Sequence, residues 1–160
     1  MTDFVIRPAT PDDVSVVFGL IGQLAEYERL SHMVVGNEAM LRAALFGAHP
    51  AAEVVLGIED GTPVGFALYY TTFSTFLCRA GIHLEDIFVM QQRRGRGYGK
   101  ALLKHVADIA TQRGCGRLEW TVLDWNEPSI AFYDSIGGVS MKEWILYRMT
   151  HDRFSVFSQS

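Results

Sequence analysis

The stretch that decides the fold is Gln91-Gln92-Arg93-Arg94-Gly95-Arg96-Gly97-Tyr98-Gly99-Lys100. It separates an apolar run that predicts a buried strand, 82–90, from a periodic run that predicts a helix, 98–113. Glycines let the backbone approach a ligand closely, and the free amides at a helix N-terminus favour negative charge. We therefore expect a site for an anion at this turn.

Two common phosphate-binding motifs do not match this turn. A Walker loop requires a glycine where Arg94 stands and Ser or Thr where Ala101 stands. A dinucleotide-binding fingerprint requires a third glycine at the position of Lys100. The pattern that remains is Arg94-x-x-Gly97-x-Gly99. A turn that only joins strand to helix is the alternative, but the three glycines and four basic residues at positions 93–100 make it the weaker interpretation.

The charge of the chain supports a local anion site. The formal net charge is −4, which argues against a general nucleic-acid binder. Five of the 14 lysines and arginines nevertheless fall within positions 93–104. An acidic chain with one basic cluster indicates a small anionic ligand rather than a polyanion. No apolar run approaches the roughly 20 residues that a membrane span needs, so we expect no membrane partner.

Length and cysteine content indicate one cytoplasmic domain. A chain of 160 residues, 49% of them hydrophobic, has the size and composition of a single globular domain over 1–160. Cys78 and Cys115 form no CxxC pair, so no disulfide framework or zinc ribbon is implied. The histidines show no metal spacing, and we expect no metal. A reducing cytoplasm is the expected location.

Hydrophobic periodicity and turn residues predict a mixed α/β fold with the order β-α-α-β-β-β-α-β-α-β-β. We expect helices on both faces of the sheet and a loop over 71–81. The expected strands are 4–8, 54–58, 64–70, 82–90, 117–123, 139–141 and 144–150. The expected helices are 10–29, 37–46, 98–113 and 126–136.

Five further segments accompany the glycine turn. They are Phe4-Val5-Ile6-Arg7-Pro8-Ala9-Thr10, Leu24-Ala25-Glu26-Tyr27-Glu28, Val64-Gly65-Phe66-Ala67-Leu68-Tyr69-Tyr70, Leu84-Glu85-Asp86-Ile87-Phe88-Val89-Met90 and Trp125-Asn126-Glu127-Pro128-Ser129-Ile130-Ala131-Phe132-Tyr133. In this order they resemble the GNAT N-acetyltransferase superfamily, and within it the diamine (spermidine/spermine) branch that includes thialysine acetyltransferases. The resemblance implies a single-domain GNAT fold with a mixed, mostly antiparallel, seven-stranded sheet.

The resemblance also implies that acetyl-CoA is the acetyl donor and binds in a notch where the fourth and fifth strands separate. Backbone amides of Ile87, Phe88 and Val89 would hold the acetyl carbonyl and the pantetheine arm. The turn would hold the pyrophosphate, and the last segment would line the other side of the cofactor. These residues are Arg94, Gly95, Arg96, Gly97, Tyr98, Gly99 and Lys100 on the turn, and Asn126, Glu127, Pro128 and Ser129 opposite.

Two catalytic roles follow from the resemblance. Tyr133 would be the general acid, because a phenol near the sulfur can protonate the departing thiolate. Its alternative is a core tyrosine on the helix face that carries Ile130. Glu85 would be the base, through water, since an ammonium must lose a proton before its nitrogen attacks. Asp86 follows it, and because strand neighbours point to opposite faces, the choice of base between them stays open.

The substrate positions distinguish this chain from polyamine enzymes. Tyr27, Glu28 and Asp86 match positions that contact the amine in the family. Ser31-His32 and Ser74-Thr75, however, stand where polyamine enzymes carry acidic residues. A shorter amine, lysine-like or thialysine, therefore fits at least as well as spermine.

We thus expect an N-acetyltransferase that acts on a small primary amine by direct attack in a ternary complex. A protein acetyltransferase for lysine or N-terminal amines is one alternative, and a CoA-binding regulatory module without catalysis is another. The resemblance implies a homodimer in which C-terminal strands contribute to the interface. The apolar segment Trp144-Ile145-Leu146-Tyr147 is compatible with that role.

Overall fold

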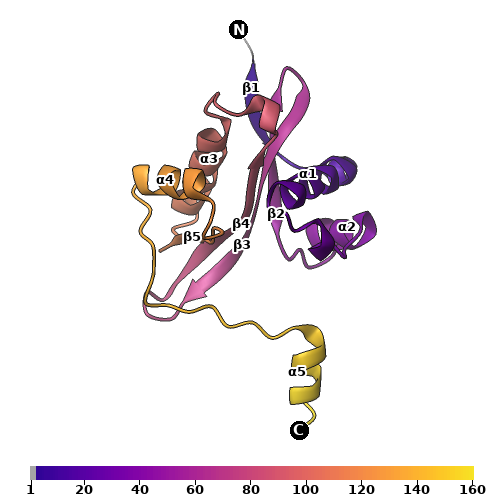
Figure 1. Cartoon of the computed structure of the whole chain (residues 1–160), viewed down its shortest axis with the longest axis vertical. Coiled ribbons are helices and arrows are strands. Elements are labelled where there is room, and N and C mark those ends of the chain that lie inside the picture. Colours follow the sequence, from indigo (N-terminus) through magenta and orange to yellow (C-terminus); the bar gives the residue numbers. More distant parts are fainter. Residues whose placement is uncertain (1–2) are drawn as a thin grey trace. The chain divides into compact units, whose positions relative to one another are not determined.

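The computed structural model describes residues 3–160, which form two compact units, one up to Thr121 and one from Val122 onward. The first unit contains a five-stranded sheet in the order β1-β2-β3-β4-β5 (Figure 1). Neighbouring strands are antiparallel, except that β4 and β5 are parallel. The strands are β1 (Phe4–Pro8), β2 (Glu53–Glu59), β3 (Thr62–Ser74), β4 (Arg79–Val89) and β5 (Leu118–Trp120).

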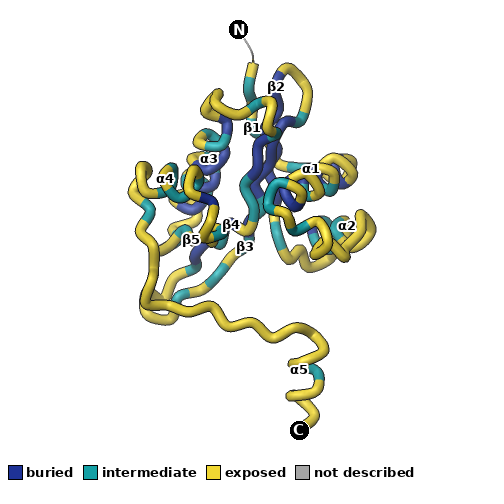
Figure 2. Tube along the Cα trace, viewed as in Figure 1, coloured by how far each residue is buried: buried dark blue, intermediate teal, exposed yellow. Residues whose placement is uncertain are grey.

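Helices cover both faces of this sheet. Helices α1 (Val14–Tyr27) and α2 (Glu38–Phe46) lie on one face, and α3 (Tyr98–Gln112) lies on the other (Figure 1). The buried positions concentrate in the middle strands and on the inward sides of α1 and α3 (Figure 2). Toward α1 and α2 the core consists of Val17, Leu20, Leu24, Leu45, Val54, Leu56, Ile58, Phe66 and Phe88. The expected α/β fold and the mostly antiparallel sheet are confirmed.

Local sequence signals explain where the helices begin. The side chain of Asn37 accepts a hydrogen bond from the backbone N–H of Met40 at 2.9 Å, as an N-cap residue does. A short 3₁₀ turn, η1 (Pro11–Asp13), precedes α1. There Asp13 accepts a hydrogen bond from the backbone N–H of Thr10 at 2.7 Å. Each cap satisfies donors that a helix N-terminus leaves without partners.

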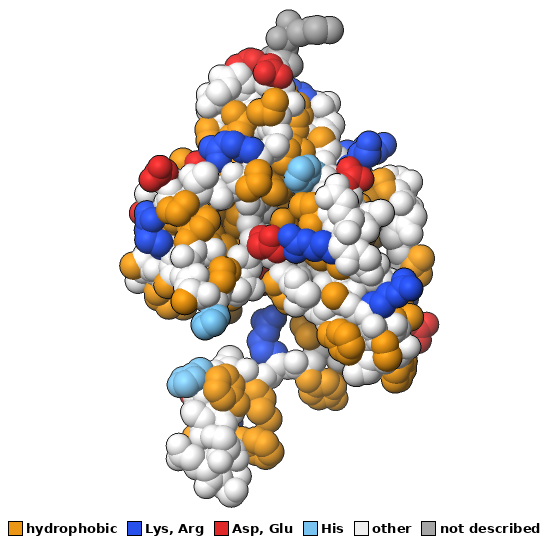
Figure 3. All heavy atoms as spheres, turned by 180° about the vertical axis from the view of Figure 1, so that it is seen from behind, with side chains coloured by type: hydrophobic (Ala, Val, Ile, Leu, Met, Phe, Trp, Pro, Cys, Tyr) orange, Lys and Arg blue, Asp and Glu red, His pale blue; other side chains and the backbone are white. Residues whose placement is uncertain are grey.

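The prediction of a seven-stranded sheet was wrong, because the two strands expected at 139–141 and 144–150 are absent. Residues 139–150 carry no strand, and the segment that follows forms a helix, α5 (His151–Phe157). Trp144 and Tyr147 are exposed, at 74% and 89%. Hydrophobic side chains are also visible on the surface of the C-terminal segment in Figure 3. β-Propensity reflects packing against a neighbouring strand, and an apolar run without such a neighbour forms no strand.

Two boundaries in the sheet also differ from the prediction. The segment 71–81, expected to be a loop, is mostly the distal part of the β3–β4 hairpin, paired from Thr71 with Ile82 to Ser74 with Arg79. Phe73 and Phe76 at this tip are hydrophobic but exposed. Hydrophobic and polar residues therefore do not alternate there as they do in a half-buried strand, and the sequence shows no strand signal. The fifth strand, expected over 117–123, is shorter and covers only Leu118–Trp120.

The second unit contains α4 (Glu127–Ser135), as expected. Asn126 caps this helix and accepts a hydrogen bond from the backbone N–H of Ser129 at 3.4 Å. Pro128 occupies the first turn, where a missing N–H costs little. Among residues 3–160, no helix is long and apolar enough to cross a membrane.

We predict that the D13N variant is less stable than the wild type by about 2 kcal/mol at pH 7, since hydrogen bonds to a charged group contribute about that much. Arg7 donates to both Asp13 oxygens, at 2.7 and 2.9 Å, and these bonds hold the pKa of the carboxyl well below its usual range. The contribution is complete above the unfolded-state pKa of about 4 and is lost as the pH falls. Urea unfolding between pH 3 and 7 measures it. The exposed Asp12, changed to Asn, is the control, and an equal loss in both variants would contradict the assignment.

Candidate active site

A β-bulge interrupts β4 at the predicted catalytic carboxylates. Asp86 pairs with Leu68 and Leu84 pairs with Tyr69, so Glu85 is an extra residue without a partner on β3. The expectation that Glu85 and Asp86 point to opposite faces assumed regular alternation, which a bulge breaks. Phe88, two residues after Asp86, packs into the core under α1. Regular alternation resumes after the bulge and places Asp86 on that same face.

The edge of β4 loses its second partner next to this bulge. β5 pairs with β4 only from Ile82 to Leu84 and ends at Trp120. Ile87, Phe88 and Val89 pair with β3 but lie beyond the end of β5. The backbone of these three residues therefore has one edge without a strand partner within residues 3–160. This open edge lies where the resemblance implies that the cofactor binds.

Three carboxylates gather at the bulge. Burial, together with the negative charges of Glu85 and Glu28, raises the pKa of Asp86 to about 6. Glu28 follows the last residue of α1, and burial raises its pKa too. Glu85 is more exposed, at 54% of its side chain, and its Oε2 lies 3.5 Å from Nε2 of His83. Such a cluster attracts a cation and holds a carboxylate that can accept a proton near neutral pH.

Arg94 connects the glycine turn with the end of α1. Its guanidinium carbon lies 4.2 Å from the ring centroid of Tyr27 and 5.4 Å from that of Phe88. Its Nε donates a hydrogen bond to the carbonyl of Val89 at 3.0 Å. The structure thus brings together Tyr27, Glu28, Asp86 and Arg94, which the sequence assigned partly to the substrate and partly to the cofactor.

The glycine turn leads from β4 into the N-terminus of α3. Gly95 and Gly97 have φ values of 78° and 82°, a left-handed conformation that favours glycine. None of the described residues accepts a hydrogen bond from the backbone N–H groups of residues 95–100. These donors, together with the helix dipole, suit an anion such as a phosphate.

Glu59, the buried carboxylate beside this turn, was not predicted from the sequence. Arg96 and Tyr98 donate hydrogen bonds to it and Arg93 forms an ion pair with it, so part of the basic cluster is neutralised within the protein. Glu59 immediately precedes Asp60-Gly61, the hairpin turn between β2 and β3. Its position at a strand end gives no local signal, since its partners lie 37 and 39 residues further along the chain for Arg96 and Tyr98.

The remaining predicted residues belong to the second unit. Tyr133 is half-buried on α4, and its ring centroid lies 5.5 Å from that of Phe132. Asn126 is buried, Ser129 is half-buried, and Glu127 and Pro128 are exposed. Their place relative to the sheet stays a prediction.

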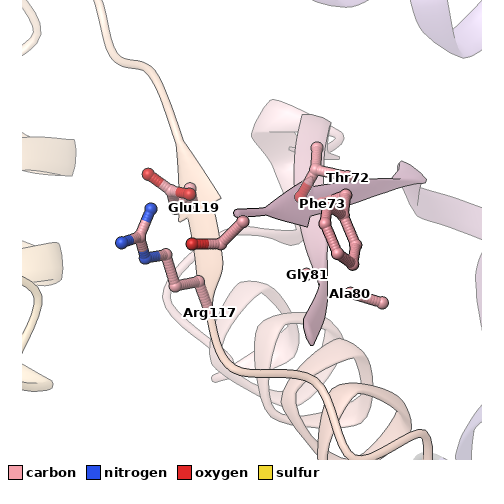
Figure 4. A pocket seen from close by; sticks show the side chains of 7 residues that line it. Thr72, Phe73, Ala80, Gly81, Arg117 and Glu119 are labelled. Atoms are coloured by element: carbon pink, nitrogen blue, oxygen red, sulfur yellow. The ribbon is translucent and has the colours of Figure 1, made fainter. Parts of the chain in front are cut away.

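A hollow at the distal end of the hairpin lies apart from these groups. Its volume is about 60 Å³, enough to hold a few water molecules. Arg117 and Glu119 line it from β5 and the residues before it (Figure 4). The other lining residues are Thr72, Phe73, Ser74, Ala80 and Gly81. It is too small for an acyl-CoA. Within the described residues, no group of three or more His, Cys, Asp or Glu is placed to hold a metal ion.

Comparison with known proteins identifies the family of this chain. Residues 22–137 match the model of the acetyltransferase (GNAT) family. This chain is a GNAT N-acetyltransferase. A thialysine N-epsilon-acetyltransferase of Mus musculus is 38% identical over 89% of this chain and 90% of its own length. An L-ornithine N5-acetyltransferase of Arabidopsis thaliana is 33% identical over 92% of this acetyltransferase and 84% of its own length.

Solved structures show the same fold. An integron cassette protein from the mobile metagenome of V. cholerae superposes with a TM-score of 0.82 at 27% identity, covering 98% of both chains. An aminoglycoside N-acetyltransferase in complex with CoA gives a TM-score of 0.73 at 21% identity over 93% of this acetyltransferase and 96% of that chain. The family uses acetyl-CoA as its acetyl donor.

We predict that the D86N variant is more stable than the wild type at pH 8. A carboxyl whose folded-state pKa lies above its unfolded value stabilises the fold at low pH, and that contribution is lost as the pH rises from about 4 through about 6. The neutral Asn in D86N does not undergo this loss of stability. The free energy of unfolding of D86N therefore exceeds that of the wild type by about 2 kcal/mol at pH 8, and the difference shrinks toward zero at pH 4. Urea unfolding at several pH values measures it, with the exposed Asp108 changed to Asn as control. Equal stability of D86N and wild type at pH 8 would mean that the Asp86 carboxylate is fully hydrated.

Proposed function

We propose that this acetyltransferase, with residues 1–160 as one domain, transfers the acetyl group of acetyl-CoA to a primary amine of a small cationic molecule. The substrate class is a thialysine-like, ornithine-like or short diamine compound. The observation that carries the proposal is the carboxylate cluster of Asp86, Glu85 and Glu28, directly before the free edge of β4. A cationic amine and an acetyl thioester bound on either side of this bulge would meet there.

Acetyl-CoA is a substrate whose parts fit the groups described above. The free edge at Ile87, Phe88 and Val89 supplies backbone donors and acceptors for the acetyl carbonyl and the pantetheine arm. The turn from Gly95 to Lys100 supplies free amides for the pyrophosphate. We further propose that Asn126, Glu127, Pro128 and Ser129 line the other side of the pantetheine arm.

The reaction begins when the ammonium of the substrate loses a proton to the Glu85–Asp86 pair, directly or through water. Asp86 is the better matched acceptor, since a pKa of about 6 lies closer to neutral pH than that of an ordinary carboxyl. The free amine attacks the thioester carbonyl, so a C–N bond forms and the C–S bond then breaks. Tyr133 donates its phenolic proton to the departing thiolate and regains a proton from the new amide nitrogen or from water.

The acidic cluster also supports the choice of substrate class. Asp86 and Glu28 are close enough for each charge to affect the other, so a cation between them removes a repulsion. The relatives named above act on thialysine and L-ornithine, by their names, and both molecules carry more than one amine.

We also propose a cytoplasmic homodimer. Light scattering at micromolar concentration tests the dimer, and a monomer would exclude it.

We predict that the Y133F variant loses about 100-fold in kcat, the lower end of the contribution of a general acid. Its Kd for CoA, measured by titration calorimetry, should stay within about twofold because the ring and its contact with Phe132 remain. Tyr147, exposed at 89%, is changed to Phe as the matched control. Unchanged turnover in Y133F would remove the general-acid assignment.

We predict that thiol release from acetyl-CoA is fastest with thialysine, ornithine or a short diamine and slower with spermine and lysine peptides. Changing Glu28 to Gln should raise the KM of the amine about fivefold, because a charge-assisted contact is lost, and leave the KM of acetyl-CoA unchanged. The exposed Glu26 on the same helix, changed to Gln, is the control. Preference for a peptide would favour a protein acetyltransferase, and no release with any amine would favour a CoA-binding regulatory module.

A further inference from the structure

Glu59, the last residue of β2, receives two hydrogen bonds and forms an ion pair with residues around the glycine turn. Its Oε1 accepts from Nη1 of Arg96 at 2.6 Å and from the hydroxyl of Tyr98 at 2.5 Å. Its Oε2 lies 2.8 Å from Nη1 of Arg93. Only 3% of the Glu59 side chain is exposed. A buried carboxylate with this many donors stays ionised, and these contacts lower its pKa, Tyr98 contributing most.

The three partners of Glu59 lie on both sides of the turn. Arg93 ends the short helix η3 (Gln91–Arg93), Arg96 lies between the two left-handed glycines, and Tyr98 is the first residue of α3. The backbone N–H groups of residues 95–100 donate to none of the described residues, so hydrogen bonds from these amides do not hold the turn in shape. The contacts with Glu59 link the two ends of the turn, in addition to the hydrogen bond from Nε of Arg94 to the carbonyl of Val89.

The phenol of Tyr98 is itself held in place. Its ring is stacked on that of Phe4, with centroids 3.9 Å apart and planes 3° from parallel. Phe4 lies against Gly57, where a Cβ would meet the Phe4 ring at 2.8 Å. Phe4 of β1 and Glu59 of β2 thus hold Tyr98 at the start of α3 in place. Glu59 also contacts the two arginines.

The arginines keep donors available for a ligand. A guanidinium has five N–H donors, and Glu59 occupies one Nη1 group on each arginine. Both side chains remain 42% exposed. A guanidinium oriented by a carboxylate loses less entropy when it binds a phosphate than a free side chain does.

We propose that Glu59 is a positioning residue for acyl-CoA, and that Arg93 and Arg96, held by it, bind a phosphate group of that substrate. The inference rests on the proposed placement of the CoA phosphates at the glycine turn. It adds Arg93 to the binding residues and gives a buried acid a role in binding an anion. Either the pyrophosphate or the 3′-phosphate of CoA offers the chemistry that two oriented guanidiniums recognise.

The sign of one measurement separates positioning from simple electrostatics. If Glu59 acted only as a nearby negative charge, its removal would tighten the binding of CoA. If it positions the arginines and the turn, E59Q weakens CoA binding although the site becomes more positive. We expect the Kd of CoA and the KM of acetyl-CoA to rise about tenfold, the loss of one or two charge-assisted hydrogen bonds. The kcat at saturation and the KM of the amine should stay within about twofold.

The matched control is E53Q, at the other end of β2, where Glu53 is 45% exposed and pairs with Arg113. Y98F keeps the carboxylate and the stacked ring, and we expect it to weaken CoA binding about threefold; it serves as the test should E59Q fail to fold. R93M should also weaken binding, and the double variant E59Q/R93M should lose less than the two single losses combined, since both act through one contact. Comparing R93M on acetyl-CoA and 3′-dephospho-acetyl-CoA assigns the phosphate.

Unchanged or tighter CoA binding in E59Q, or fully additive losses in the double variant, would overturn the role of Glu59. The G97A variant separately tests whether the CoA phosphates bind at the glycine turn, since alanine is strained at the φ of 82° found there. If folded G97A binds CoA normally, the phosphates lie elsewhere and the proposed site fails. If G97A weakens binding and E59Q does not, the proposed site holds and only the role of Glu59 is wrong.

Discussion

β4 pairs with β3 along nearly its whole length but with β5 over only three residues, and the proposed chemistry depends on this difference. From Asp86 to Val89 the backbone pairs with β3 on one side and has no strand partner among the described residues on the other. The bulge at Glu85 lies at the same point. A rigid strand with one open edge can bind an extended ligand arm by main-chain hydrogen bonds, as an added strand would. The glycine turn then follows at the end of that strand.

Charge of opposite sign is separated along this strand. Carboxylates gather at the bulge, and basic side chains gather at the turn that follows Val89. Arg94 lies between the two groups, stacked on Tyr27 and bonded to the carbonyl of Val89. An ammonium and a phosphate can therefore bind at the two ends of one short segment without either charge opposing the other. Glu59 is the exception to this separation, because it is an acid placed among the bases.

The parts of the fold that the sequence predicted depend on neighbouring residues. Helix α3, the glycine turn before it and the helix that begins after Asn37 all follow from short-range patterns. The bulge at Glu85 depends on the register with β3, which no run of residues in β4 reveals. The partners of Glu59 lie far along the chain, and the apolar segment around Trp144 lacked a neighbouring strand. The resemblance supplied the chemistry of Tyr133 and Glu85, which local pattern alone did not distinguish from structural roles.

The stacking of Tyr98 on Phe4 has a consequence for the order of folding. The side chain that starts α3 contacts residues of β1 and β2, which lie far earlier in the chain. Contacts between distant residues require the closure of long loops and form late. Helix α3 can therefore form early by local propensity, whereas its first turn reaches its final position only after β1 has joined the sheet. The proposed anion site at this turn would then be among the last parts of the refolding chain to form, later than its helical circular dichroism.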